Sequence, residues 1–254
     1  RQYFSYTVDI SDDIKFKIIF DVGRSGTDSR LNTYLKKAQI DYNTSYGKVS
    51  MGLIGMNTHA VQEKNWGNHF IEKSAMDKNA YSTSADLGIG FSRLLREKLN
   101  ISLQMVNGEG YKKPQGDKYH KISFNATYGE RKINKNDGYN VGLVYSTEAS
   151  DNGPSNMISA FGGYAGMGLR FGAEYDMLTK TGNYETNIIS VSTNYSVIDK
   201  IDAYFRYDIL DDNNSENKNG INYLIVGVLF KCDNRLSVAP NMRITSFEDS
   251  AKDD

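Results

Sequence analysis

The sequence of 254 residues has one cysteine, Cys232, and three prolines. It also lacks any long hydrophobic run. One cysteine excludes an intramolecular disulfide and a cysteine-rich zinc site. A transmembrane helix needs about 18 or more consecutive apolar residues, so no helix of this kind is expected. The net charge is −1, from 30 basic and 31 acidic residues, which indicates neither a nucleic-acid partner nor a polyanion.

Helical periodicity is scarce as well. Residues 70–78 have the pattern of a helix of one or two turns, whereas almost all other segments alternate with period two. The stretch 169–176, LRFGAEYD, is a clear example. Because successive side chains of a strand face opposite sides, one face of this segment is oily and aromatic and the other is charged.

The same alternation predicts about fourteen strands. They lie near residues 2–10, 14–22, 37–43, 48–55, 86–92, 99–105, 122–128, 139–146, 156–164, 167–176, 184–195, 201–209, 221–230 and 235–245. Strands of soluble proteins average about five or six residues. A tilted strand that crosses a bilayer needs about nine to eleven, and half of these segments have that length.

The lengths of the connections and the positions of the tyrosines each follow a further pattern. Short turns, as at 11–13, alternate with longer connections, expected at 23–33, 56–83 and 107–118, which is typical of outer-membrane barrels. Tyrosines at strand ends predict two aromatic girdles at the membrane interfaces, although tyrosine is also common in soluble strands. The girdle residues are Tyr42, Tyr46, Tyr128, Tyr139, Tyr164 and Tyr195 beside short turns and Tyr145, Tyr175, Tyr184 and Tyr223 beside long loops.

These patterns predict an all-β fold, a transmembrane antiparallel β-barrel formed by residues 1–254 as one domain. The oily parity faces lipid, and the charged parity faces a water-filled interior. We expect the barrel to be closed, because an open edge leaves backbone groups unsatisfied in hydrocarbon. Bacterial barrels normally start and finish in the periplasm, so one further strand at each end, and sixteen in all, are expected. A fourteen-stranded barrel with both ends outside is the alternative.

Three stretches carry a family resemblance: KNWGNHFIEKSAMDKNAYSTSADLGIG at 64–90, VNGEGYKKP at 106–114 and LSVAPNMRI at 236–244. They resemble the phosphate-selective-porin-like (porin O/P-like) group of Gram-negative outer-membrane porins. The resemblance implies a sixteen-stranded, homotrimeric pore. It also implies export through the periplasm to the bacterial outer membrane, where lipid and lipopolysaccharide surround the barrel. Phosphate is not thereby identified as the solute, because the group covers many chains of unknown selectivity. No loop holds a dense lysine cluster, which argues against a site that traps anions.

Solute selection in a wide barrel depends on the side chains that line its constriction. The parity rule predicts these pore-lining charges: Lys15, Lys17, Asp21, Lys37, Asp41, Asp86, Arg170, Glu174, Asp176, Asp202, Arg206, Asp208 and Arg243. Their signs nearly balance, which favours a transverse field in a general pore. Loop 56–83 is the candidate extracellular or constriction loop, with Glu72, Lys73 and Asp77 at the constriction. The alternatives are solvated or paired charges, and a loop that caps the barrel or contacts a neighbouring copy.

Catalysis is poorly supported. His59, His69 and His120 lack metal-ligand spacing, and His69 with Ser74 is the one nearby histidine–hydroxyl pair of the kind an outer-membrane phospholipase would need. We expect no enzyme, no metal and no cofactor. The leading hypothesis is a porin for passive diffusion of small hydrophilic solutes or ions. The alternatives are a plugged barrel whose loops bind a partner and a soluble β protein such as a propeller or lipocalin-like carrier.

Overall fold

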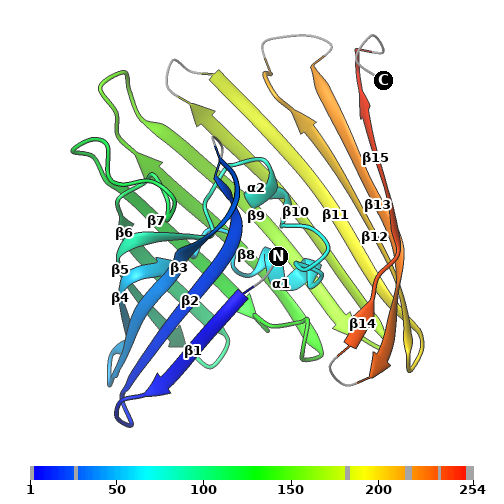
Figure 1. Ribbon diagram of the computed structural model, residues 1–254, viewed down its shortest axis with the longest axis horizontal. Coiled ribbons are helices and arrows are strands. Elements are labelled where there is room, and N and C mark those ends of the chain that lie inside the picture. The colour runs from blue at the N-terminus through cyan, green and yellow to red at the C-terminus, as the bar shows by residue number, and fades with distance from the viewer. Residues whose placement is uncertain (1–2, 26–27, 181–183, 215–218, 234–235, 250–254) are drawn as a thin grey trace.

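The computed structural model describes residues 3–25, 28–180, 184–214, 219–233 and 236–249, which form one antiparallel sheet of fifteen strands (Figure 1). This confirms the all-β prediction. The strands are β1 Tyr3–Asp9, β2 Ile14–Ser25, β3 Asp28–Thr44, β4 Gly47–Gly55, β5 Ala85–Leu95, β6 Leu99–Val106, β7 Lys121–Gly129, β8 Gly138–Glu148, β9 Ser155–Gly166, β10 Leu169–Lys180, β11 Tyr184–Ile198, β12 Ile201–Asp211, β13 Gly220–Asp233, β14 Leu236–Val238 and β15 Asn241–Phe247.

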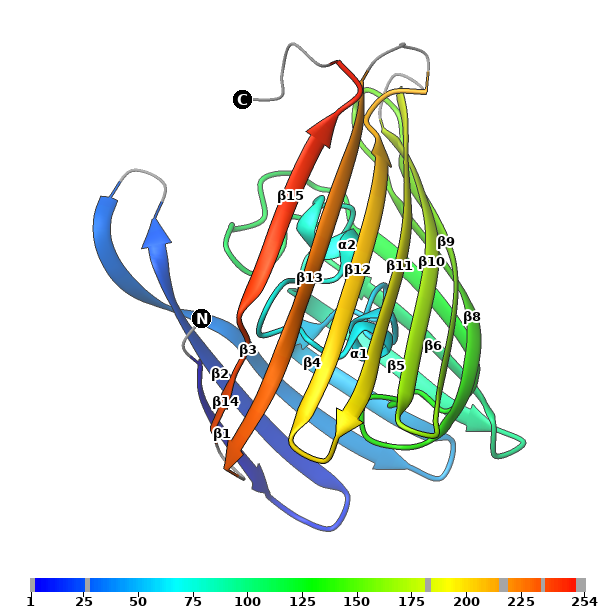
Figure 2. The ribbon, with the colours of Figure 1, turned by 90° about the vertical axis from the view of Figure 1, so that its right-hand side faces the viewer.

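The sheet curls around an interior that holds the segment between β4 and β5 (Figures 1 and 2). From β1 to β14 each strand pairs with its neighbour in sequence, and β15 pairs with β13. In the described residues no ladder joins β1 to β14 or β15, so the expected closure is absent. The count of sixteen strands stays a prediction.

Two local predictions are wrong. The strand expected near 235–245 is divided into β14 and β15 at Pro240, which has no N–H to donate to a ladder. Its carbonyl instead accepts a hydrogen bond of 3.2 Å from Val228 N, and pairing with β13 resumes. The loop expected at 23–33 is mostly strand, because β2 continues to Ser25 and β3 begins at Asp28.

The two faces of the sheet differ as the alternation predicts. Phe171 and Phe205 are 43% and 38% exposed on the outside, whereas Arg206 is 1% exposed. Eight of the ten expected girdle tyrosines are exposed, and the rings of Tyr128 and Tyr139 lie 6.3 Å apart. An apolar outer surface with aromatic borders is the surface that a membrane barrel presents to lipid. Tyr223 is an exception and is described below.

The segment between β4 and β5 carries two short helices, α1 Gln62–Trp66 and α2 Ala75–Lys78. The helix expected at 70–78 is wrong in its first half, because α2 begins only after Ser74, whose Oγ caps it by accepting from Asp77 N at 3.4 Å. α1 contacts β9, β10 and β11, and α2 contacts β11. No helix in the described ranges is long and apolar enough to cross a membrane.

Candidate pore constriction

The segment 56–84, called the inward segment below, packs against the half of the sheet formed by β8 to β13. One apolar cluster joins it to strands β8 to β11 and contains Val61, Ala75, Met76, Tyr81, Val144, Met157, Phe161, Leu178 and Ile188. A second cluster joins Trp66 to Tyr204, Tyr223 and Ile225 on β12 and β13. Each large apolar side chain buried in this way contributes about 1.5–3 kcal/mol. The inward segment is therefore part of the folded core.

Small residues on the wall let α1 approach closely. A Cβ added at Gly172 would lie 2.9 Å from the Cβ of Asn65, so a side chain there would collide with the helix. Asn65 and Asn140 exchange two side-chain hydrogen bonds of 2.9 Å, and Asn68 donates to Asn194. Packing and hydrogen bonds together fix α1 on the inner face of the sheet.

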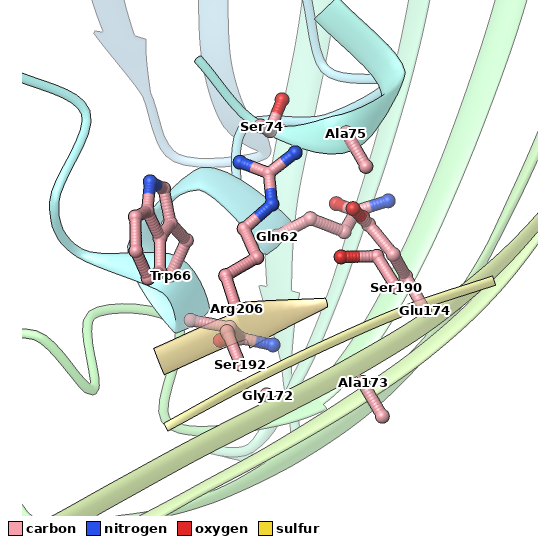
Figure 3. Close-up of a pocket in the computed structure, with 11 residues that line it drawn as sticks. Gln62, Trp66, Ser74, Ala75, Gly172, Ala173, Glu174, Ser190, Ser192 and Arg206 are labelled. Atoms are coloured by element: carbon pink, nitrogen blue, oxygen red, sulfur yellow. The ribbon is translucent and has the colours of Figure 1, made fainter. Parts of the chain in front are cut away.

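Arg206 anchors the other end of the inward segment. Its Nε and Nη2 donate to the two carboxylate oxygens of Asp208 at 2.8 and 2.6 Å, and its Nη1 donates to the carbonyl of Lys73. Its guanidinium lies 5.5 Å from the Trp66 ring centroid. Figure 3 shows the side chain between Trp66 and Ser74. The side chains of Arg206 and Asp208 are 1% and 3% exposed, so this ion pair is buried between wall and segment.

Three more of the predicted pore-lining charges lie beside the inward segment, and one of them, Asp176, is fully buried. Arg170 Nη2 donates to the carbonyl of Trp66 at 3.1 Å. Glu174 lines the small pocket beneath the two helices (Figure 3), and Asp176 is fully buried opposite Ser159 of β9. These side chains bond to the inward segment or lie beneath it, and they do not face the open part of the interior.

The three residues expected at the constriction are also engaged in the core. Glu72 Oε2 accepts from Arg243 Nη1 and from the hydroxyl of Tyr223, each at 3.1 Å. Tyr223 is therefore an inward residue and not a girdle residue. Lys73 Nζ donates to Asp77 Oδ1 at 2.8 Å, and Asp77 also accepts from Ser84 at 3.0 Å. Burial alone would raise the pKa of Asp77, but His59 when it is protonated, the charge of Lys73 and hydrogen bonds lower it.

Four of the remaining predicted residues have partners near the ends of strands or lie buried there. Asp86 accepts backbone N–H bonds from Gly108 and Gly110 at 2.8 and 3.2 Å, so it fixes the loop after β6. The other three are Lys15, which pairs with Asp9 at 3.0 Å, Asp202, which pairs with Lys231 at 2.8 Å, and Asp21, which is buried at 7% exposure.

The open part of the interior is a cavity of about 540 Å³ between the inward segment and strands β1 to β6. Its charged lining is mostly basic: Lys17, Lys36, Lys37, Lys48, Lys64 and Arg131. Among the lining residues of the described chain, Glu63 is the one carboxylate. Asp41 lies next to the cavity and pairs with Lys48 at 3.5 Å. Hydroxyl and amide groups complete the lining, including Ser5, Gln39, Ser50, Asn57, Ser102 and Gln104.

A β-bulge places two consecutive lysines on this cavity. Ile19 pairs with Lys37 and Phe20 pairs with Leu35, so Lys36 is an extra residue in β3. An extra residue breaks the alternation, and Lys36 and Lys37 both line the cavity. The sequence contains a trace of this bulge, since outward apolar residues are spaced by three from Leu35 to Ala38 and by two from Ala38 to Ile40.

Glu63, the acidic residue of the cavity lining, contacts a histidine. His69 Nδ1 lies 2.9 Å from Glu63 Oε2. Burial alone would raise the pKa of Glu63, but the hydrogen bond and charge of His69 lower it to about 2. Burial lowers the pKa of His59, which also lines the cavity. The balance of signs predicted from the sequence is not found in this cavity, because most of the acids lie elsewhere.

Both members of the possible catalytic pair have other partners. His69 contacts Glu63, while Ser74 Oγ caps α2. No group of three or more histidine, cysteine, aspartate or glutamate side chains in the described residues is arranged to hold a metal ion.

The curved antiparallel sheet with a segment folded inside it is the fold of outer-membrane porins. OmpT, an outer membrane protein of Vibrio cholerae, in its trimer form, is similar with a TM-score of 0.69 and 13% identity, over 96% of this chain and 80% of that chain. OmpF of Salmonella typhi, in complex with daunomycin, has a TM-score of 0.68 and 11% identity, over 98% and 84%. A porin refined at 1.8 Å has a TM-score of 0.56 and 9% identity, over 91% and 87%.

At these identities the likeness shows the fold alone. No protein-family model matches the chain, and no curated protein matches it. The similar structures support an outer-membrane barrel, and they do not support the narrower phosphate-selective-porin-like group.

Proposed function

We propose that the protein is a porin of the bacterial outer membrane that lets small hydrophilic solutes diffuse passively and prefers anions. The observation that carries the proposal is the cavity, in which five lysines and one arginine line about 540 Å³ and one carboxylate opposes them. In a narrow wet passage with walls of low dielectric constant, charge of one sign raises the local concentration of oppositely charged solutes. The lysines come from β2, β3, β4 and α1, so they spread the positive charge around the cavity.

The exposed apolar face of the sheet supports an integral position in the outer membrane, reached through the periplasm, with lipid and lipopolysaccharide as neighbours. The similarity to porins supports a channel without catalytic activity. A homotrimer is part of the same proposal, because one of the similar structures is a trimer form. The mass of the detergent-solubilised protein, measured by light scattering, tests this part, and a mass of one chain contradicts it.

The experiment that tests the channel is reconstitution of the whole chain into planar bilayers in KCl. We expect discrete conductance steps. In a salt gradient, the sign of the reversal potential should show that chloride permeates more readily than potassium. The tight packing of the inward segment against β8 to β13 favours one alternative, a plugged barrel whose loops bind a partner. A folded, inserted and non-conducting protein would contradict the proposal and support that alternative.

A further inference from the structure

Three tyrosines and two lysines form a cluster at the end of the sheet that carries the long loops. Lys36 Nζ donates to the hydroxyl of Tyr3 at 3.0 Å and lies 4.5 Å from the centre of its ring. The rings of Tyr34 and Tyr111 lie 6.0 Å apart, and Lys112 Nζ lies 5.0 Å from the first and 5.8 Å from the second. The residues of this tyrosine–lysine cluster belong to β1, β3 and the loop after β6.

The cluster is continuous with the cavity and is firmly placed. Tyr3 and Lys36 line the cavity themselves. Tyr111 N donates to the carbonyl of Ala85 at 3.0 Å, and the two N–H bonds that Asp86 accepts hold the loop just before Tyr111. Aromatic faces therefore adjoin a chamber whose walls carry ammonium, hydroxyl and amide groups.

Each part of this lining matches a different chemical feature. An ammonium group binds a carboxylate through charge-assisted hydrogen bonds. Hydroxyl and amide side chains such as Ser50, Gln39 and Gln104 exchange hydrogen bonds with a hydroxylated solute. The face of a tyrosine ring offers rigid contact area to a flat apolar face, such as the C–H face of a sugar ring. An inorganic anion has no apolar face to pack on the rings. A neutral sugar has no charge for the lysines to attract.

We propose that the tyrosine–lysine cluster and the cavity form a binding path for monosaccharide acids, that is, pyranose rings bearing one carboxylate. The inference rests on the proposed channel and names its solute class. The carboxylate pairs with Lys36 or Lys112, the ring lies against Tyr111 or Tyr34, and the hydroxyl groups meet the polar lining deeper inside. In the structure the ammonium groups of Lys36 and Lys112 lie over the tyrosine rings.

Planar-bilayer recording in KCl tests this, with glucuronate added on the side of the long loops. Glucuronate is expected to interrupt the current, and glucose, which lacks the charge, and acetate, which lacks the ring, are each expected to be at least about tenfold weaker. Tyr111→Leu should weaken the glucuronate block about fivefold, and Tyr111→Phe, which keeps the ring, should retain it. The control Tyr119→Leu, in the same loop but outside the cluster, should leave conductance and block unchanged.

The outcomes separate the two proposals. An inserted protein without KCl conductance contradicts the channel itself. Conductance with equal block by glucose or acetate, or with a block that Tyr111→Leu does not weaken, overturns the solute class alone. If Tyr111→Leu does not fold, the comparison of glucuronate with glucose and acetate on the unchanged protein still decides.

Discussion

Arg243 Nη1 donates a hydrogen bond of 3.1 Å to Glu72 Oε2, and Arg243 Nη2 donates to the carbonyl of Ile71 at 2.7 Å. The last strand thus holds the inward segment from the same wall as Arg206, because both arginines pair with Ile225 of β13. The Arg243 side chain is 42% exposed, so water screens this ion pair.

We expect Arg243→Gln to loosen the inward segment with little effect on the barrel, because an exposed ion pair contributes less than about 1 kcal/mol. Hydrogen exchange of the backbone around residues 70–73 should become faster. Lys231→Gln is the matched control, since Lys231 pairs with Asp202 at 2.8 Å and similar exposure without touching the segment. Equal exchange in the two variants would show that Arg243 does not hold the segment.

Arg206 and Asp208 form a buried pair, and removal of one member leaves an unpaired charge. Arg206→Met should lower the free energy of unfolding in detergent by about 3–5 kcal/mol. The double variant Arg206→Met/Asp208→Leu should recover part of that loss, because it leaves no charge behind. Urea titrations monitored by tryptophan fluorescence provide the measurement. A single variant as stable as the unchanged protein would contradict the burial of this pair.

Gly172 allows α1 to lie on the sheet. In Gly172→Ala the new Cβ would lie 2.9 Å from Asn65 Cβ, so the helix must shift toward the cavity. We expect a stability loss of about 1–3 kcal/mol and a single-channel conductance below that of the unchanged protein. Gly162→Ala is the control, because its Cβ would meet its nearest neighbour at an ordinary 3.4 Å. A conductance equal in the two variants would contradict the position of α1.

The charge of the cavity should depend on pH through His59. Burial places its pKa below the ordinary value of 6.5, so it is neutral at pH 7 and gains a proton only in acid. The preference for chloride over potassium should therefore rise as the pH falls through the lowered pKa, and His59→Gln should reduce the rise. Glu63, with a pKa of about 2, stays ionised over this range and contributes no change. A rise that is equally large in His59→Gln would contradict this account.

The lowered pKa of His59 also makes the stability of the folded protein depend on pH. The pKa of His59 is lower in the folded than in the unfolded chain, so the unfolded chain binds more protons in mild acid. The stabilisation from neutral His59 is complete above pH 6.5 and is lost as the pH falls from there to the lowered pKa. Urea midpoints measured at pH 7.5 and 5 should differ in that direction, and His59→Gln should reduce the difference. An increase in stability on acidification would contradict the burial of His59.

The strands and their outward faces could be predicted because alternation is a local property of the sequence. Phe205 and Arg206 are neighbours with opposite environments, and the period of two alone places one outside and the other inside. Pro240 interrupts a strand for an equally local reason. The extra residue at Lys36 shifts the parity by one, and a strict alternation rule assigns that lysine to the wrong face.

The interior could not be predicted in the same way, because it depends on which wall the inward segment covers. Parity places Glu174, Asp176, Arg206 and Asp208 inside but does not reveal that two helices lie over them. Glu72 accepts a hydrogen bond from Arg243, which is 171 residues away in the sequence. The residues that line the cavity from the segment are instead His59, Glu63, Lys64 and His69, which a pattern of alternation does not distinguish from other loop residues.

The most direct test of the central claim is the reversal potential in a KCl gradient for the unchanged protein and for Lys36→Gln/Lys37→Gln. The control is Lys98→Gln/Lys200→Gln, which removes the same charge from two exposed turn residues away from the cavity. We predict a chloride-over-potassium permeability ratio above one in the unchanged protein and in the control, and a ratio lower by roughly twofold or more in the bulge variant. A cation-selective protein, or a ratio that the bulge variant leaves unchanged, would contradict the account.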